Sequence, residues 1–206
     1  MTSREVLEAR LVLYRLLAAL YRYPLTAQKL SALQSLQAEG ESAAAQAVRE
    51  LQQAADNLSL EHLNVEMTRL LEGPGVTPAV PYASYYLNGK QLMGAAAQAA
   101  HRLYLEHGVE PEQGSIPPDH IALELGFLSV LAERALTDAA PAAALEASLL
   151  FVREHLQPWL TLFCAALETG SREPFFAALA EATQQFVDED EAWLQESFQE
   201  TVTSLS

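Results

Sequence analysis

The hydrophobic positions of this chain recur with the spacing of α-helices and nowhere with the sustained alternation of strands. Over residues 4–23, aliphatic side chains return every three or four positions, which predicts a well-buried first helix that Pro24 ends. Thr26 is the expected N-cap of a short second helix. An Ala-rich third helix is expected over 42–55, and Ser59 opens a fourth.

The second half of the chain continues the helical spacing. A helix is predicted over 90–107, and another enters at residues 117–118, where two prolines lose nothing by lacking an N–H. A long helical stretch over 141–169 should kink or break immediately before Pro158. The last helix runs from Pro174 onward. The pattern therefore predicts an all-α fold.

Two segments rich in proline and glycine interrupt the helices. Residues 73–89 are apolar and aromatic where most loops are polar, so this loop should be packed or should form a docking surface. Residues 108–118 are the best linker candidate and are predicted to be a hinge. We therefore expect an N-terminal lobe over 1–107 and a C-terminal lobe over 119–206.

Composition is consistent with a cytoplasmic helical protein. The 206 residues, 50% of them apolar, can form one sizeable core or two small lobes that share an interface. No targeting signal is recognised at the N-terminus, and no apolar stretch is long enough to span a bilayer. Cys164 is the single cysteine, which excludes an intrachain disulfide and a four-cysteine zinc site. These features predict a cytoplasmic protein.

The charge is strongly acidic. A formal net charge of −15 argues against nucleic acid and anionic membranes as partners, and no stable membrane insertion is expected. Residues 181–206 hold seven carboxylates and no lysine or arginine. One interpretation is a solvated helical tail that keeps the chain in solution. The other is an attraction for basic peptide segments, and both remain open at this point.

The pair Asp119-His120 is the most suggestive polar feature. Asp119 suits the first turn of a helix, and His120 shares a helix face with Glu124, four residues on. The two could bind a metal together or transfer a proton, although the other histidines supply no matching second pair. The alternative is a histidine that forms hydrogen bonds across a lobe interface. Cys164 lies among apolar neighbours, and no motif for nucleophilic catalysis or phosphate binding is present, so we predict no enzyme, no metal and no cofactor.

Several aromatic side chains follow prolines. Tyr82 and Tyr85 come after Pro81, and Trp159 comes after Pro158. Aromatic residues at helical spacing usually belong to the core. A proline beside them, however, fixes the backbone, which also suits them as rigid anchors for a peptide.

Four segments together resemble the TorD/DmsD family of redox-enzyme maturation chaperones, in the same order and with similar separations. They are Gly73-Pro74 with Pro81-Tyr82-Ala83-Ser84-Tyr85-Tyr86, then Pro117-Pro118-Asp119-His120-Ile121, His155-Leu156-Gln157-Pro158-Trp159, and Glu173-Pro174-Phe175-Phe176. The resemblance spans about residues 58–191. Two departures are Ile116, where the family usually has Glu, and Phe176, where it usually has Tyr.

The resemblance implies two helical lobes joined by a hinge, in a monomer or a domain-swapped homodimer. It also implies binding of a molybdopterin-containing oxidoreductase precursor, through its twin-arginine signal peptide or its catalytic subunit, before cofactor insertion and export. A groove of rigid aromatics beside carboxylates would suit the basic pair and apolar stretch of such a leader. The residues expected to contact the client are Pro81, Tyr82, Ser84, Tyr85, Pro118, Asp119, His120, Glu124, Pro158 and Trp159.

Two other functions stay open. The first is a metal-dependent helical enzyme that uses His120 and Glu124. The second is a helical adaptor or regulator without maturation activity. Metal content would separate the enzyme from the chaperone, and partner identity would separate the adaptor.

Overall fold

A computed structural model describes residues 3–56, 58–73, 77–110, 116–137 and 141–204. The regular elements over these residues are all helical, as predicted. They are α1 (Ser3–Leu20), α2 (Ala27–Ser35), α3 (Ala43–Asp56), α4 (Leu60–Met67), the π-helical turn η1 (Thr68–Glu72), α5 (Ala83–Leu87), α6 (Ala95–Glu106), α7 (Ile121–Thr137), α8 (Pro141–Phe151), the π-helical turn η2 (Val152–Leu156), α9 (Gln157–Gly170) and α10 (Pro174–Ser204).

Local sequence signals set several helix starts. The side chain of Thr26 accepts a hydrogen bond from the backbone N–H of Lys29 (3.3 Å), which confirms the predicted N-cap of α2. Ser59 caps α4 in the same way, by accepting from His62 N–H at 3.2 Å. These caps satisfy N–H groups that have no partner inside the helix.

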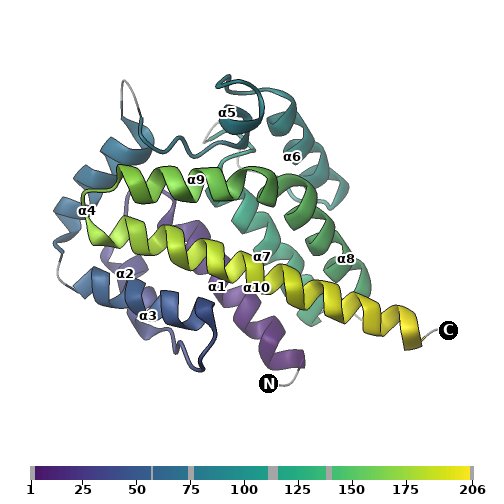
Figure 1. The fold of residues 1–206 in the computed structure, drawn as a ribbon. Coiled ribbons are helices and arrows are strands. Elements are labelled where there is room, and N and C mark those ends of the chain that lie inside the picture. Colours follow the sequence, from purple (N-terminus) through teal and green to yellow (C-terminus); the bar gives the residue numbers. More distant parts are fainter. Residues whose placement is uncertain (1–2, 57, 74–76, 111–115, 138–140, 205–206) are drawn as a thin grey trace.

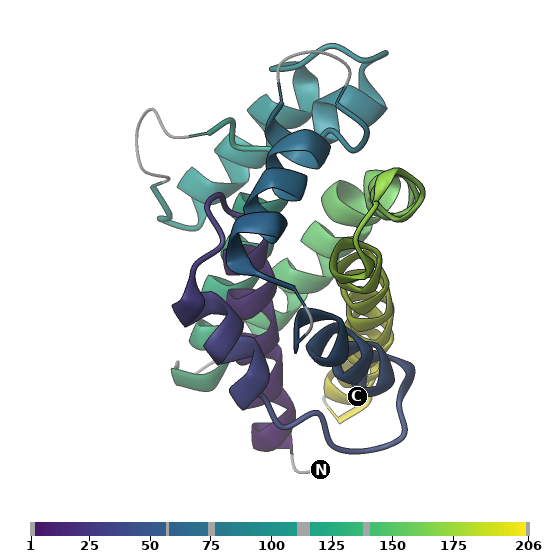
Figure 2. The same cartoon turned by 90° about the vertical axis from the view of Figure 1, so that its left-hand side faces the viewer.

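Two helix pairs, each with one helix from the first half of the chain and one from the second half, form the body of the fold. α1 packs along α7, and α3 packs along α10. The long α10 also contacts α8 and α9, and Figure 1 shows it running diagonally across the molecule beside α9. Turned by 90°, α9 and α10 are seen nearly end-on, with α4 to their left (Figure 2). Within the part of the chain that the structure describes, no helix is long and apolar enough to cross a membrane.

One hydrophobic core extends through these pairs. It joins Tyr14 and Leu17 of α1 to Leu125 of α7, Phe163 of α9 and Phe186 of α10. Helices assigned to the two predicted lobes are therefore in direct contact. Part of the predicted hinge, residues 111–115, lies outside the described residues. The lobes, the hinge and an exchange of lobes between protomers stay predictions.

Where a kink or break was predicted before Pro158, the structure has the wider, π-helical turn η2 and no break. Proline has no N–H to donate, and the N–H of Gln157 reaches back five residues to the carbonyl of Val152. The helix thus continues from α8 into α9 with one extra residue in its turn.

Two predicted helix starts are wrong by several residues. α6 begins at Ala95 and not at residue 90, because Lys90 and Met93 have left-handed backbone conformations (φ 67° and 60°) that no helix contains. α7 begins at Ile121 and not at residues 117–118, which form a turn closed by a hydrogen bond from His120 N–H to the Pro117 carbonyl (3.1 Å). The Asp119-His120 pair therefore precedes the helix.

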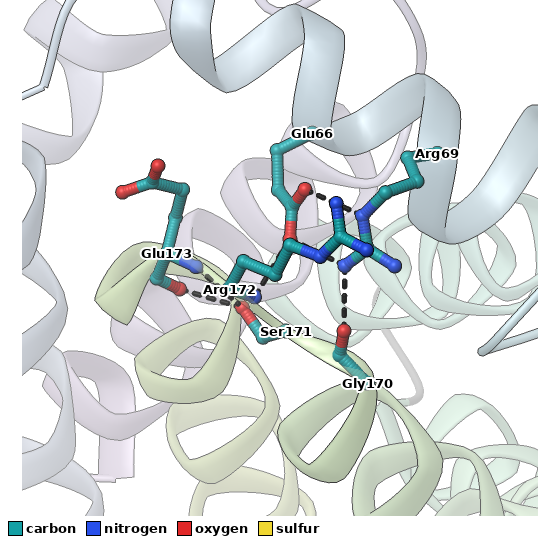
Figure 3. A network of polar contacts seen from close by, with 6 residues as sticks. All are labelled: Glu66, Arg69, Gly170, Ser171, Arg172 and Glu173. Atoms are coloured by element: carbon teal, nitrogen blue, oxygen red, sulfur yellow. Dashed lines mark hydrogen bonds and ion pairs between the residues drawn. The ribbon is translucent and has the colours of Figure 1, made fainter.

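A buried carboxylate ties α4 and η1 to the corner between α9 and α10. Glu66 accepts from Arg69 Nε (2.7 Å) and Nη2 (2.6 Å) and from the backbone N–H of Arg172 (2.7 Å). Arg69 Nη2 also donates to the Gly170 carbonyl at 2.6 Å. Figure 3 shows Glu66 and Arg69 reaching from one helix onto this corner. The network fixes the helix that leads into the 73–89 loop.

Candidate functional site

The aromatic loop and the Asp119-His120 pair come together through the backbone. Tyr82 and His120 form an isolated antiparallel bridge. The bridge is flanked by hydrogen bonds from Ala83 N–H to the Asp119 carbonyl and from Ile121 N–H to the Pro81 carbonyl, both 3.0 Å. Two motifs that lie far apart in the sequence thus meet at the start of α7.

Asp119 positions the aromatic loop at this meeting point of the two motifs. Its Oδ2 accepts from the backbone N–H of Ser84 (2.8 Å), in the first turn of α5. Asp119 and Ser84 are both fully buried. A carboxylate at a helix N-terminus is favoured by the helix dipole and by the unpaired N–H groups there. Asp119 therefore orients the aromatic loop from the interior of the protein, and its carboxylate is not on the surface.

His120 is buried, with one ring nitrogen engaged. Its Nδ1 accepts from the backbone N–H of Ala122 at 3.0 Å, and its ring meets that of Tyr82 edge-on, with centroids 5.1 Å apart. Burial, and secondly the positive charge of Arg22, lower the pKa of His120 to about 3. The imidazole is therefore neutral at neutral pH. Because Nδ1 accepts, the proton is on Nε2.

His120 lines a small cavity, which we name the His120 cavity. Its volume is about 260 Å³, and it is lined by Tyr21, Arg22, Tyr23, Glu72, Ile116 and His120. His120 Nε2 has no hydrogen-bond partner among the described residues and lies 4.0 Å from Glu72 Oε1. Glu72 is partly exposed, and burial raises its pKa. The cavity thus offers one neutral donor, one carboxylate and the guanidinium of Arg22.

Of the six residues that line this cavity, sequence reasoning predicted only His120 as a site residue, and it named Ile116 only as a departure from the family pattern. Tyr21, Arg22 and Tyr23 follow the first helix, and Glu72 ends η1. Two tyrosines around an arginine directly before Pro24 were a local signal. Nothing in the sequence, however, connected that segment with His120.

Glu124 and Trp159 form a separate pair that is buried in the core. The indole N–H of Trp159 donates to Glu124 Oε2 at 3.1 Å, and both residues are inaccessible to solvent. Tyr86 stacks on Trp159 with ring centroids 5.8 Å apart. Burial raises the pKa of Glu124 well above its ordinary value. The expected open groove lined by Trp159 and Glu124 is therefore wrong for this conformation, because both belong to the core.

The remaining predicted site residues lie partly at the meeting point of the two motifs and partly on the surface. Tyr82 and Tyr85 are half-buried. The carbonyl of Pro118 accepts from the Tyr104 hydroxyl at 2.7 Å, which fixes the turn before α7. Pro158 is exposed at the start of α9. Contact of any of these residues with a client stays a prediction.

The geometry offers little to a metal ion. Within the described ranges, no group of three or more His, Cys, Asp and Glu side chains is placed to hold one. Glu124 pairs with Trp159, while His120 Nε2 lies nearest to the carboxylate of Glu72. The alternative of metal co-ligation by His120 and Glu124 therefore has no support from this arrangement.

Comparison with known proteins defines the family. Residues 37–165 match the family described as nitrate reductase delta subunit, and the chain belongs to this family. Chaperone protein TorD of Vibrio cholerae serotype O1 is 36% identical over 127 residues, which cover 60% of this chain and 58% of that protein. The match thus spans less than two thirds of this relative's length. Chaperone protein TorD of Shewanella loihica is 30% identical over 204 residues, which cover 89% and 92% of the two chains.

A solved structure has a similar fold. A protein from Archaeoglobus fulgidus described as a redox enzyme maturation protein superposes with a TM-score of 0.56, 26% identity and coverage of 90% of this chain and 93% of its own. The resemblance to TorD-type maturation chaperones and the all-α fold predicted from the sequence are confirmed. The relatives are named as chaperones and not as catalysts, in agreement with the prediction that the chain is not an enzyme.

Proposed function

We propose that the chain is a dedicated maturation chaperone for a molybdopterin-containing oxidoreductase. It binds the precursor in the cytoplasm, through its twin-arginine signal peptide or its apo catalytic subunit. Binding assists cofactor insertion and holds back premature export. The observation that carries the proposal is the His120 cavity at the meeting point of the two motifs that carry the family resemblance.

The chemistry of this cavity suits a peptide that presents a backbone carbonyl to His120 and one basic side chain to Glu72. The Nε2–H of His120 can donate to a backbone carbonyl, because the ring is neutral and this nitrogen has no acceptor among the described residues. The carboxylate of Glu72 at the rim suits a guanidinium. The exposed ring of Tyr23 and the half-buried ring of Tyr82 provide apolar contacts nearby. The acidic chain adds long-range attraction for a basic leader.

The two alternative functions make different predictions. A metal enzyme would hold stoichiometric metal after purification without a histidine tag. An adaptor would bind a partner without changing its cofactor content. Neither alternative has a specific observation in its favour, and the chaperone interpretation has the family and the cavity.

The test is quantitative capture of partners from the native host grown anaerobically, with identification by mass spectrometry. Wild-type chain should recover a molybdopterin oxidoreductase precursor. Glu72→Gln and His120→Asn should recover at least about fivefold less, because each removes one polar group that the peptide would contact (about 1 kcal/mol). His120→Asn keeps an acceptor for the Ala122 N–H, so the start of α7 should fold normally.

The matched control is Glu106→Gln, which makes the same charge change at an exposed position at the end of α6. It should capture as much precursor as the wild type. Equal recovery by all variants would remove the His120 cavity from the proposal. Recovery of unrelated proteins alone by the wild type would overturn the chaperone assignment.

A further inference from the structure

The connection from α1 to α2, residues 21–25, forms part of the wall of the His120 cavity. Tyr21, Arg22 and Tyr23 line the cavity from this connection. The N–H groups of Tyr21 and Arg22 still bond back onto α1, to the carbonyls of Leu17 (3.1 Å) and Ala19 (3.2 Å). Beyond them the connection has no regular structure, so its other backbone groups need partners outside a helix or sheet.

Lys29, one turn into α2, supplies the first of these partners. Its ammonium donates to the carbonyl of Arg22 and to the carbonyl of Pro24, the latter at 2.8 Å. The side chain is half-buried, and hydrogen bonds from a charged donor are stronger than those between neutral groups. Tyr23 lies between the two carbonyls in the chain, so Lys29 holds the backbone on both sides of this cavity-lining residue.

Asn64 of α4 supplies the second partner. Its Oδ1 accepts from the backbone N–H of Leu25 at 2.8 Å, and its Nδ2 donates to the Leu25 carbonyl at 2.9 Å. The same Nδ2 donates to the carbonyl of Leu60 at 3.0 Å, which fixes the amide on its own helix. Leu25 is buried, and both of its backbone groups are thus satisfied by one side chain. Asn64 therefore ties the end of the connection to α4.

The same helical segment carries another part of the cavity wall. α4 continues directly into η1, and η1 ends at Glu72, whose carboxylate lines the cavity. Asn64 thus links the connection that bears Arg22 and Tyr23 to the element that bears Glu72. Neither Lys29 nor Asn64 lines the cavity itself. Their hydrogen bonds fix where the lining residues of the two elements lie relative to each other.

We infer that Lys29 and Asn64 are positioning residues for client binding at the His120 cavity. They hold Arg22 and Tyr23 at a set separation from Glu72, and they act on the client only through these lining residues. Binding groups must be held within about 0.5 Å of their productive geometry, and supporting hydrogen bonds from a second layer of residues do this. The inference rests on the proposed function, because it assigns both residues a part in binding the same client.

The test uses the oxidoreductase precursor that the wild-type chain captures, with recovery measured per folded full-length chain. Lys29→Met removes both donors but keeps an unbranched side chain, and Asn64→Ala removes all three hydrogen bonds. Each should recover at least about threefold less precursor. Lys29→Arg keeps a charged donor and should recover nearly as much as the wild type. The matched controls are Gln28→Met and Val65→Ala, at exposed neighbouring positions of the same helices, and they should leave recovery unchanged.

Double variants separate positioning from a general structural role. Asn64→Ala and Lys29→Met are each combined with Glu72→Gln. If the two residues act through the cavity, each double variant should lose less than the product of its two single losses, because the contact of Glu72 is already gone. Independent structural damage would make the losses multiply. If Asn64→Ala does not fold, Lys29→Met carries the test, because Lys29 is only half-buried.

The outcomes distinguish this inference from the proposed function. Lower recovery by Lys29→Met and Asn64→Ala, restored by Lys29→Arg and less than multiplicative with Glu72→Gln, supports it. Wild-type recovery by either folded variant overturns the role of that residue, and losses that multiply overturn the positioning role of both. In these two cases the proposed function stands as long as Glu72→Gln and His120→Asn still recover less precursor. Wild-type recovery by Glu72→Gln and His120→Asn overturns the His120 cavity as the client site, and the inference with it.

Discussion

Replacing Glu66 by alanine removes the acceptor that joins α4 and η1 to the corner between α9 and α10 (Figure 3). The side chain is 8% exposed and accepts three hydrogen bonds, two from Arg69 and one from the backbone of Arg172. Hydrogen bonds to charged groups contribute about 1.5–3 kcal/mol each when buried. The side chain of Arg69 is 27% exposed and Arg172 is exposed, so water replaces part of this loss. We expect Glu66→Ala to lower the free energy of unfolding by about 2–3 kcal/mol.

Urea unfolding followed by helical circular dichroism measures this loss. The corresponding fall in Tm is about 5–10 °C for a chain of this length. Glu8→Ala is the control, because Glu8 pairs with Arg4 on the surface at 53% and 75% side-chain exposure. Such pairs contribute about 0–1 kcal/mol. A Glu66→Ala variant no less stable than Glu8→Ala would refute the structural role of the network.

The pH dependence gives a second measure of the same network. Burial alone would raise the pKa of Glu66, but hydrogen bonds from Arg69 and Arg172 outweigh it and lower the pKa. The folded state thus favours the ionised carboxyl, so the stabilisation is present above about pH 4.3, the ordinary glutamate value. It is lost as the pH falls through the lower, folded pKa. The stability difference between wild type and Glu66→Gln should therefore shrink in acid, and a constant difference would contradict this reasoning.

Three further predictions concern other parts of the core. Asp190→Asn should destabilise the chain by about 3–5 kcal/mol in urea unfolding, because it leaves the guanidinium of Arg10 buried without its counter-charge; a loss under 1 kcal/mol would contradict this. Gly170→Ala should cost about 1–3 kcal/mol, since the new Cβ would lie 2.7 Å from Cβ of the rigid Pro78; an unchanged Tm would count against the close packing. Burial raises the pKa of Cys164, so a thiol reagent at pH 8 should react only as the fold opens, and immediate labelling of folded protein would disprove its burial.

Local signals in the sequence predicted much of the helical structure. The caps at Thr26 and Ser59 and the disturbance before Pro158 depend on groups a few residues apart, and each occurs where the sequence placed it. The starts of α6 and α7 were misplaced. Met93 adopts a left-handed conformation that no helical pattern reveals.

The candidate site was predictable only in part. The motifs around Tyr82 and His120 were recognised, but their backbone bridge depends on residues far apart in the sequence. Trp159 next to a proline has the pattern of a surface anchor, yet its indole N–H finds Glu124 and both are buried. Hydrogen-bond partners of this kind follow from tertiary packing, which periodicity does not describe.

The central claim is that the chain promotes cofactor insertion into a molybdopterin oxidoreductase. Its most direct test is the molybdenum content of the captured oxidoreductase, purified from host cells that contain the chain and from cells that lack it. The account predicts a several-fold lower molybdenum content per polypeptide without the chain, restored by wild-type chain and less by His120→Asn. Equal molybdenum content with and without the chain would contradict the account.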